Sequence, residues 1–164
     1  MNIHTTASRF ETPHQMIRYM HNFAYTDYDF LMDPDEVYQD KRGSCHDQAF
    51  FELDELERQG LNPEGRFLIA VDKDGIGEET HSFVYYKDDD KWCWLENAWK
   101  DLRGIRYYTS EQELIDSVMF AFGQRNAFDK LYIANFNPSE HTIGEDLETF
   151  VDICMNSAEE YQIS

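Results

Sequence analysis

One segment of this chain limits its possible folds more than any other. Residues 44–59 contain neither proline nor glycine, so nothing in them interrupts a helix, and Gly60 suits the end of one. Four side chains in this segment fall on one helical face: Cys45, Ala49, Leu53 and Leu56. The sequence therefore predicts a helix that begins near Cys45 and turns this thiol toward the core.

Further helix signals lie on both sides of this segment. Thr12-Pro13 and Asp33-Pro34 each combine a capping side chain with a first-turn proline. Residues 110–113 have the sequence Ser-Glu-Gln-Glu, which is a capping box. Residues 147–154 carry an apolar stripe at helical spacing, which predicts a helix near the end of the sequence.

Short apolar or aromatic runs predict the strands 66–71, 81–86, 91–99, 105–108 and 131–136. An acidic turn at residues 88–90 joins two of these strands, so we expect them to pair as an antiparallel hairpin. A glycine-containing loop over residues 72–79 precedes that hairpin. The predicted fold class is α+β, with an antiparallel sheet packed against helices and the Cys-bearing helix against the sheet.

Length and composition indicate one globular domain. The chain has 164 residues, of which 41% are hydrophobic, and we expect a single domain over residues 1–164. Residues 1–9 lack the apolar run of a signal peptide, and no stretch approaches the roughly 20 apolar residues of a membrane helix. Three cysteines far apart in sequence favour a reducing compartment. We therefore expect a cytoplasmic protein without membrane partners.

The charge balance bears on partners rather than on fold. The chain carries 33 acidic against 14 basic side chains, for a formal net charge of -19. Such a field repels nucleic acid and favours cationic partners, so direct binding to nucleic acid is disfavoured. A separate possibility is that the acidic surface imitates nucleic acid and binds a nucleic-acid-binding protein.

Cys45 and His81 are the candidate nucleophile and base. A thiol becomes nucleophilic when a helix N-terminus or a neighbouring imidazole lowers its pKa, and Cys45 lies at a predicted helix start. His81 begins a predicted strand directly after the glycine-containing loop, which places it near an open edge of the sheet. A third residue is needed to orient the imidazole.

The register of the predicted hairpin offers two candidates for that third residue. A two-residue turn at Asp88 and Asp89 sets His81 opposite Glu96, whereas a three-residue loop sets it opposite Asn97. We favour Glu96, because its register also pairs Lys87 with Asp90.

Ordinary structural roles compete with the catalytic interpretation. A lone cysteine on a helix is usually core packing, and a lone histidine is more often structural than catalytic. Metal binding by Cys45, His46, Asp47 and His81 is disfavoured, because adjacent Cys45 and His46 on a helix do not easily face one ion. We expect no metal site and no cofactor.

Residues 43–49 have the pattern G-x-C-x-D-x-A, residues 80–84 form a short histidine-bearing strand segment, and residues 92–99 form a tryptophan-rich one. In this order they resemble the nucleophile segment, the histidine strand and the strand that ends in the third catalytic residue of the transglutaminase-like cysteine hydrolases of bacterial or phage type. The resemblance spans residues 33–108 and implies a transglutaminase-like or papain-like core. It also implies thiolate attack on an amide or acyl carbonyl, and transfer of the acyl group to water or an amine.

The resemblance carries over to residues one by one. Cys45 and His81 match the family's nucleophile and base, whereas Glu96-Asn97 stands where the family has Asp followed by Pro. Asn97 would act as the asparagine of papain-like enzymes does. Gln39 lies six residues before Cys45, the spacing of the papain-type oxyanion glutamine.

The sequence thus favours a cysteine protease, another hydrolase or an acyltransferase with a Cys-His-Glu/Asn catalytic triad. Its substrate would be a peptide, a protein or a small amide or acyl compound. The alternatives are an inactive relative of the same fold that binds a protein, and the acidic decoy of nucleic acid.

Overall fold

The structure is a computed structural model that describes residues 7–27, 29–72, 78–125 and 130–162. Its helices are α1 (Pro13–Met20), α2 (Pro34–Asp40), α3 (Cys45–Arg58), α4 (Glu111–Arg125) and α5 (Leu147–Met155). Two short 3-10 helices are η1 (Lys100–Leu102) and η2 (Pro138–Glu140). The strands are β1 (Ala24–Tyr25), β2 (Arg42–Gly43), β3 (Glu64–Val71), β4 (Glu78–Asp88), β5 (Lys91–Glu96), β6 (Gly104–Tyr108), β7 (Lys130–Phe136) and β8 (Glu159–Tyr161).

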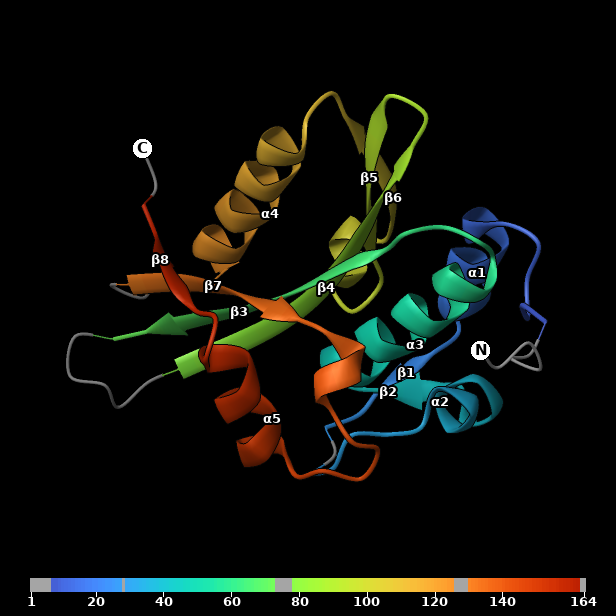
Figure 1. The fold of residues 1–164 in the computed structure, drawn as a ribbon, viewed down its shortest axis with the longest axis horizontal. Coiled ribbons are helices and arrows are strands. Elements are labelled where there is room, and N and C mark those ends of the chain that lie inside the picture. The colour runs from blue at the N-terminus through green and yellow to red at the C-terminus, as the bar shows by residue number, and fades with distance from the viewer. Residues whose placement is uncertain (1–6, 28, 73–77, 126–129, 163–164) are drawn as a thin grey trace.

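A six-stranded antiparallel sheet crosses the molecule in the order β6-β5-β4-β3-β7-β8 (Figure 1). A separate two-stranded parallel pair, β1 and β2, leads into α3. The expected α+β class and antiparallel sheet are therefore confirmed. No helix within the described residues combines the length and apolarity that crossing a bilayer requires.

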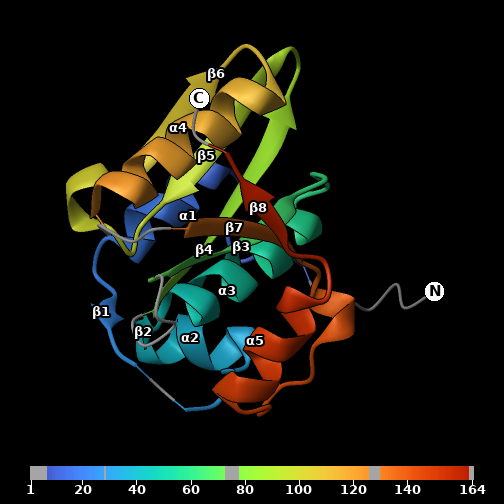
Figure 2. The same ribbon diagram turned by 90° about the vertical axis from the view of Figure 1, so that its left-hand side faces the viewer.

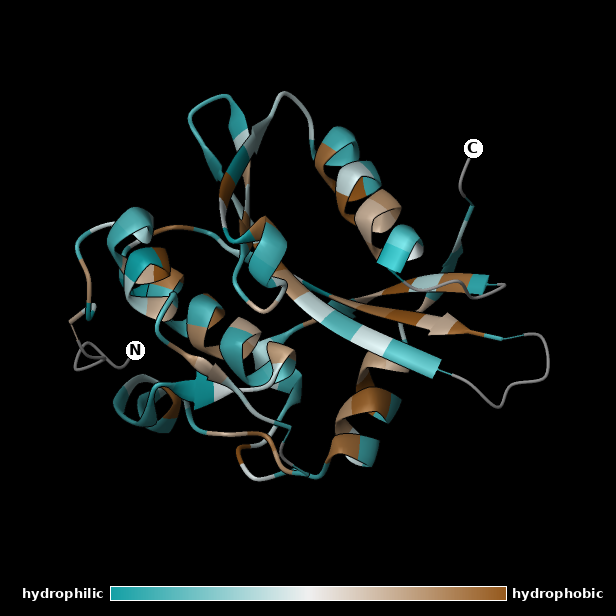
Figure 3. Ribbon diagram, turned by 180° about the vertical axis from the view of Figure 1, so that it is seen from behind, coloured by the Kyte–Doolittle hydropathy of each residue, from teal (hydrophilic) through white to brown (hydrophobic). Residues whose placement is uncertain are grey.

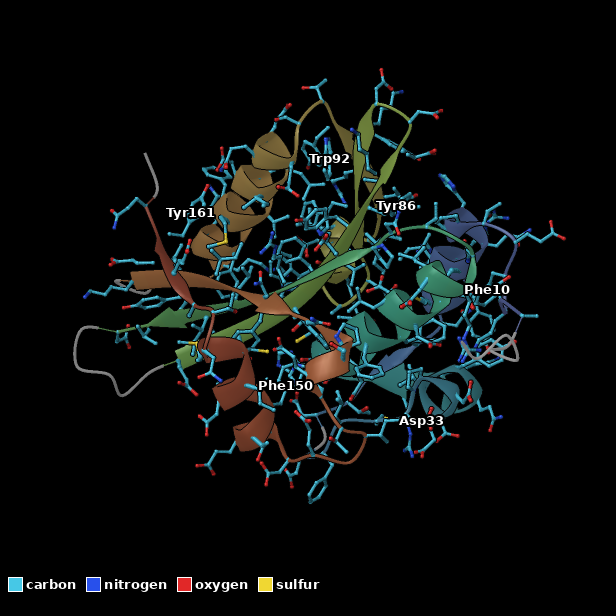
Figure 4. The ribbon with its side chains drawn as sticks, viewed as in Figure 1. Phe10, Asp33, Tyr86, Trp92, Phe150 and Tyr161 are labelled. Carbon is cyan, nitrogen blue, oxygen red and sulfur yellow. The ribbon has the colours of Figure 1, made fainter. Side chains whose placement is uncertain are left out.

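The helices form two layers, one on each side of the sheet (Figures 1 and 2). Helix α4 covers one face, where Leu68 and Phe83 belong to its apolar cluster. Helices α1, α2, α3 and α5 contribute to the cluster on the other face, which includes Phe67 and Val84. Neighbouring residues of one strand thus enter opposite clusters, as the pleat requires, and side chains fill both layers (Figure 4).

Most predicted elements are present. The helices begin where Thr12, Asp33 and Ser44 cap them, and α4 and α5 follow their sequence signals. The predicted strand 91–99 is shorter, since β5 ends at Glu96. The short strands β1, β2 and β8 carry too few residues to show periodicity and were not predicted. The predicted loop 72–79 lies largely outside the described residues, and its last two residues belong to β4.

Both predicted registers of the β4–β5 hairpin are wrong. The pairing runs from Asp88 opposite Lys91 to Val84 opposite Leu95, so the turn consists of residues 89 and 90. Asp89 takes a left-handed conformation with φ of 54°, which aspartate tolerates in a tight turn. The charge match proposed for Lys87 with Asp90 is made instead by Asp88 and Lys91.

The start of α3 is fixed by a reciprocal cap. The backbone N–H of Asp47 donates to Ser44 Oγ, and Asp47 Oδ2 accepts from the backbone N–H of Ser44. Asp47 Oδ1 also accepts from the backbone N–H of Met32, which ties the preceding loop to the helix. The capping box leaves Cys45 as the first residue of α3, inside the protein.

Candidate active site

Cys45 lies at the N-terminus of α3 with only 5% of its surface exposed. Two imidazoles flank its thiol. Sγ lies 3.8 Å from Nδ1 and 3.9 Å from Nε2 of His46, and the thiol also has a side-chain hydrogen bond and a charge interaction with His81. The structure therefore brings together the cysteine and the histidine that the sequence singled out.

Two side chains hold the His81 ring: Glu96 contacts its Nε2 atom, and Trp99 stacks on its face. Its Nε2 lies 2.9 Å from Glu96 Oε1, and its ring stacks on Trp99 with centroids 3.8 Å apart at 14°. Both His81 and Glu96 are 2% exposed. Since Glu96 engages Nε2, Nδ1 is the nitrogen that remains for Cys45.

The electrostatics of this pair favour an ion pair. Burial opposes ionisation of Cys45, yet the charges and hydrogen bonds of His46 and His81 lower its pKa well below the ordinary value. Burial likewise lowers the pKa of His81, but the Glu96 carboxylate and the Cys45 thiolate outweigh it and raise that pKa to about 9. The two shifts together favour a thiolate beside an imidazolium.

Glu96 is the neighbour of His81, and Asn97 takes another role. The second carboxylate oxygen of Glu96 accepts from the backbone N–H groups of Asn97 and Trp99. The Asn97 side chain donates to the backbone of Met20 at 2.9 Å and to Gln48 Oε1 at 2.8 Å. Asn97 thus braces α1 and α3 around the site.

Gln39 stands apart from this constellation. It is exposed near the end of α2, and none of the described contacts of the Cys45 thiol involves it. The glutamine that lies next to the site is Gln48, one turn into α3, whose amide donates to the backbone carbonyl of Gly43.

His46 fastens the start of α3 to β4. Its Nδ1 lies 2.6 Å from Ser82 Oγ and its Nε2 lies 3.3 Å from Thr80 Oγ1, while its ring packs on Phe150. Thr80 and Ser82 flank His81 and point to the opposite side of the strand from it. Successive β4 residues therefore hold the two imidazoles that flank Cys45.

Two further residues of the site were not predicted from the sequence. Tyr25 interacts with Cys45, and burial together with this interaction raises the pKa of Tyr25. Tyr25 reaches the thiol because it pairs with Gly43, two residues before Cys45. Glu52, on α3, is 4% exposed with its Oε2 unpartnered among the described residues. Its spacing of seven from Cys45 marks the same helical face.

Burial raises the pKa of Glu52 well above its ordinary range, and the Glu96 carboxylate raises it further. Burial beside Glu96 therefore favours the protonated form of Glu52, on the wall of the site that α3 provides.

A second cysteine–histidine–glutamate arrangement lies on the α5 side. His141 Nδ1 is 2.8 Å from Glu145 Oε2, and its Nε2 is 3.8 Å from Cys154 Sγ. Here burial and the charges of Glu145 and Glu140 raise the pKa of Cys154 to about 12. Cys154 is therefore a neutral thiol at physiological pH, in contrast with Cys45.

Among the described residues, no group of three or more His, Cys, Asp or Glu side chains is arranged to hold a metal ion. The three cysteines are free thiols. A scan against models of protein families finds no match, and no curated protein matches this chain.

Proposed function

We propose that this chain is a cysteine-dependent hydrolase or acyltransferase with a transglutaminase-like or papain-like core. One observation carries the proposal: Cys45, whose pKa is lowered, meets His81, whose pKa is raised and whose ring is oriented by Glu96. A helix-start thiolate beside an oriented imidazolium is the arrangement that nucleophilic cysteine catalysis requires.

The reaction would proceed in two half-reactions on an amide or acyl substrate. The Cys45 thiolate attacks the carbonyl carbon, an S–C bond forms, and the carbonyl oxygen takes the negative charge. Collapse of this intermediate breaks the bond to the leaving group, which receives its proton from His81. His81 then removes a proton from water or an amine, which attacks the thioester and releases the thiolate.

The oxyanion would be stabilised at the start of α3. The first backbone N–H groups of a helix have no partner within it, and the helix dipole favours negative charge there. Glu96 keeps the His81 ring oriented through both steps and favours its imidazolium form before and after the proton transfers, because its second oxygen is anchored by backbone N–H groups. The raised pKa of Glu52 favours its protonated form, which would not repel the oxyanion.

A second candidate is a binding protein that keeps the fold without turnover. The burial of Cys45 and His81 favours it, because a substrate must reach a thiol that is 5% exposed. The Tyr25 hydroxyl also occupies a position against the sulfur. On the catalytic proposal, substrate binding displaces Tyr25.

Acylation by an activated ester tests the proposal. The protein is incubated with p-nitrophenyl acetate at pH 7, nitrophenolate release is followed, and the acetylated residue is located by mass spectrometry. We expect a hydroxylamine-sensitive acetyl group on Cys45 followed by its hydrolysis. Cys154→Ala should behave as the wild-type protein does, and Cys45→Ala should form no such adduct.

Three other outcomes have definite meanings. A stable acetyl thioester on Cys45 of the wild-type protein, without turnover, would support the binding protein rather than the enzyme. His81→Ala is the reference for this outcome, because it removes the base for deacylation. Equal nitrophenolate release by the wild-type protein and Cys45→Ala would refute the proposal. Acetylation mainly at Cys93 or Cys154 would do the same.

A further inference from the structure

A cleft of about 470 Å³ lies between the first residues of β4 and helix α5. Its lining includes two apolar side chains, Leu147 and Val151, and four carboxylates, Glu78, Glu79, Glu148 and Asp152. Figure 3 shows the hydrophilic start of β4 and the largely hydrophobic helix α5. The cleft therefore has an apolar wall and an acidic rim.

The four carboxylates are available to an external cation. All four side chains are exposed, and none makes an ion pair with any described residue. Among the described residues, no lysine or arginine belongs to the cleft lining. Four carboxylates without a described basic partner around one cleft create a local field that attracts positive side chains.

An apolar surface continues from the cleft toward the start of α3. Leu147 also lines a shallow hollow with Phe30 and His46. Leu147 is 44% exposed and Phe30 is 60% exposed, although both are large apolar side chains. The backbone N–H of Leu147 donates a hydrogen bond to the carbonyl oxygen of Asp29, which precedes Phe30. The side chains of Leu147 and Phe30 therefore belong to one continuous surface.

This surface runs past the candidate active site. Thr80 lines the cleft and lies 3.3 Å, through Oγ1, from His46 Nε2. His46 in turn lines the hollow and contacts the Cys45 thiol. The acidic cleft and the apolar hollow are therefore each lined by one member of the bonded Thr80–His46 pair, and His46 contacts the nucleophile.

We propose that this groove, defined by the acidic cleft and the Phe30–Leu147 surface, binds a polypeptide segment that carries lysine or arginine a few residues away from a large apolar residue. The proposal rests on the proposed function and names its substrate class. A free amine or a polyamine would match the acidic rim alone, and an acidic peptide would be repelled by it. Only a chain with both kinds of side chain matches both ends.

Peptide binding to Cys45→Ala tests the inference, because this variant binds without reacting. The probes are two fluorescein-labelled heptapeptides with a central glutamine, two lysines at one end and two phenylalanines at the other, in both chain directions. We expect saturable anisotropy with at least one of them, which weakens as salt rises from about 50 to 500 mM because salt screens exposed charges. Peptides with glutamate for lysine, or alanine for phenylalanine, should bind at least about tenfold more weakly.

Two matched sets of variants locate the binding. Neutralising the rim by Glu78→Gln, Glu79→Gln, Glu148→Gln and Asp152→Asn should weaken binding about tenfold, since each exposed charge pair contributes up to about 1 kcal/mol. The control neutralises four exposed carboxylates outside the cleft by Glu11→Gln, Glu36→Gln, Glu57→Gln and Asp90→Asn. Phe30→Ala should also weaken binding, whereas Phe120→Ala, equally exposed on α4, should not.

The inference is overturned by equal loss of affinity in the rim and control sets, by equal binding of the glutamate peptides, or by no binding of either probe. Equal affinity for spermidine and the probes would reduce the groove to a site for small cations. Circular dichroism verifies that each variant is folded. Failure of peptide binding with normal acetylation of Cys45 would overturn this inference alone, and failure of acetylation would overturn the proposed function.

Discussion

The Nε2 atom of His81 lies 2.9 Å from Oε1 of Glu96, with both side chains almost completely buried. The other oxygen of this carboxylate accepts two backbone N–H groups, so Glu96 keeps its position whether or not a substrate is present. A buried, fully bonded carboxylate holds a neighbouring imidazole charged as well as oriented. The first two predictions follow from this relationship.

Glu96→Gln should lower the pKa of His81 from about 9, by roughly one to three units, because the carboxylate that favours the imidazolium is gone. The measurement is an NMR titration of the His81 ring. Asn97→Ala is the matched control, since Asn97 bonds Met20 and Gln48 rather than His81. If Asn97→Ala lowers this pKa as much as Glu96→Gln does, Glu96 is not the orienting residue.

Iodoacetamide should alkylate Cys45 at a rate that changes little between pH 7 and pH 8.5, because the lowered pKa of Cys45 leaves it a thiolate throughout. In His81→Ala the rate at pH 7 should fall and then rise with pH, because the pKa of Cys45 is lowered less by His46 alone than by both imidazoles. Mass spectrometry gives the rate at each cysteine. A wild-type rate that climbs steeply up to pH 9 would contradict the ion pair.

Turnover should have an alkaline limit of its own. Loss of the His81 proton near pH 9 removes the acid that protonates an amine leaving group. Hydrolysis of a peptide anilide should therefore decline as pH rises through about 9, while alkylation of Cys45 does not. Parallel decline of both rates would indicate unfolding rather than titration of His81.

Glu52→Gln should stabilise the protein increasingly as pH rises. The folded-state pKa of Glu52 is raised above its unfolded value, so the folded protein holds a proton that the unfolded chain releases, and stability is lost as pH rises above about 4.5. The glutamine removes this loss, which amounts to roughly 1 kcal/mol per pH unit inside the window. Urea unfolding at pH 5 and pH 8 measures the difference.

Glu57→Gln provides the control, because Glu57 lies on the same helix and is exposed. Its effect on stability should be small at both pH values. A benefit of Glu52→Gln that is the same at pH 5 and pH 8 would show that Glu52 is already ionised in the folded protein.

Gly43→Ala should lower the free energy of unfolding by about 1–3 kcal/mol, because the added methyl group would lie 2.8 Å from Asp47 Cβ and press on the cap of α3. It should also slow alkylation of Cys45, which the cap positions. Gly60→Ala is the comparison: Gly60 has φ of 85° and open space around it, so alanine there is strained but distant from the cap. Slower alkylation in both variants would argue against a role for the cap.

The sequence predicted the main helices and strands because capping residues and apolar spacing are local signals. The choice of Glu96 over Asn97 has a different basis. The observed turn lies one residue later than the favoured two-residue turn at Asp88 and Asp89. Each β4 residue therefore faces a β5 residue two positions further along, and a shift of two leaves every side chain on the same face of the sheet. Glu96 therefore stays on the His81 face even though both predicted registers were wrong.

Other features of the site leave no periodic pattern. Tyr25 reaches the thiol through a two-residue parallel pairing, and His46 does so through hydroxyl groups on β4. The His141–Cys154 contact depends on how the segment before α5 folds back on it. Each of these contacts is set by tertiary structure, and a single sequence does not encode such pairings in its local spacing.

The bonds that surround Cys45 also have a consequence for how the protein folds. His46 reaches a partner 36 residues away and Asn97 one 77 residues away, so no short segment assembles the site. Closing such long loops is slow compared with forming a helix. During refolding, helix α3 can therefore form well before its first residue becomes reactive, and rapid alkylation of Cys45 would mark the arrival of the native state rather than of a compact intermediate.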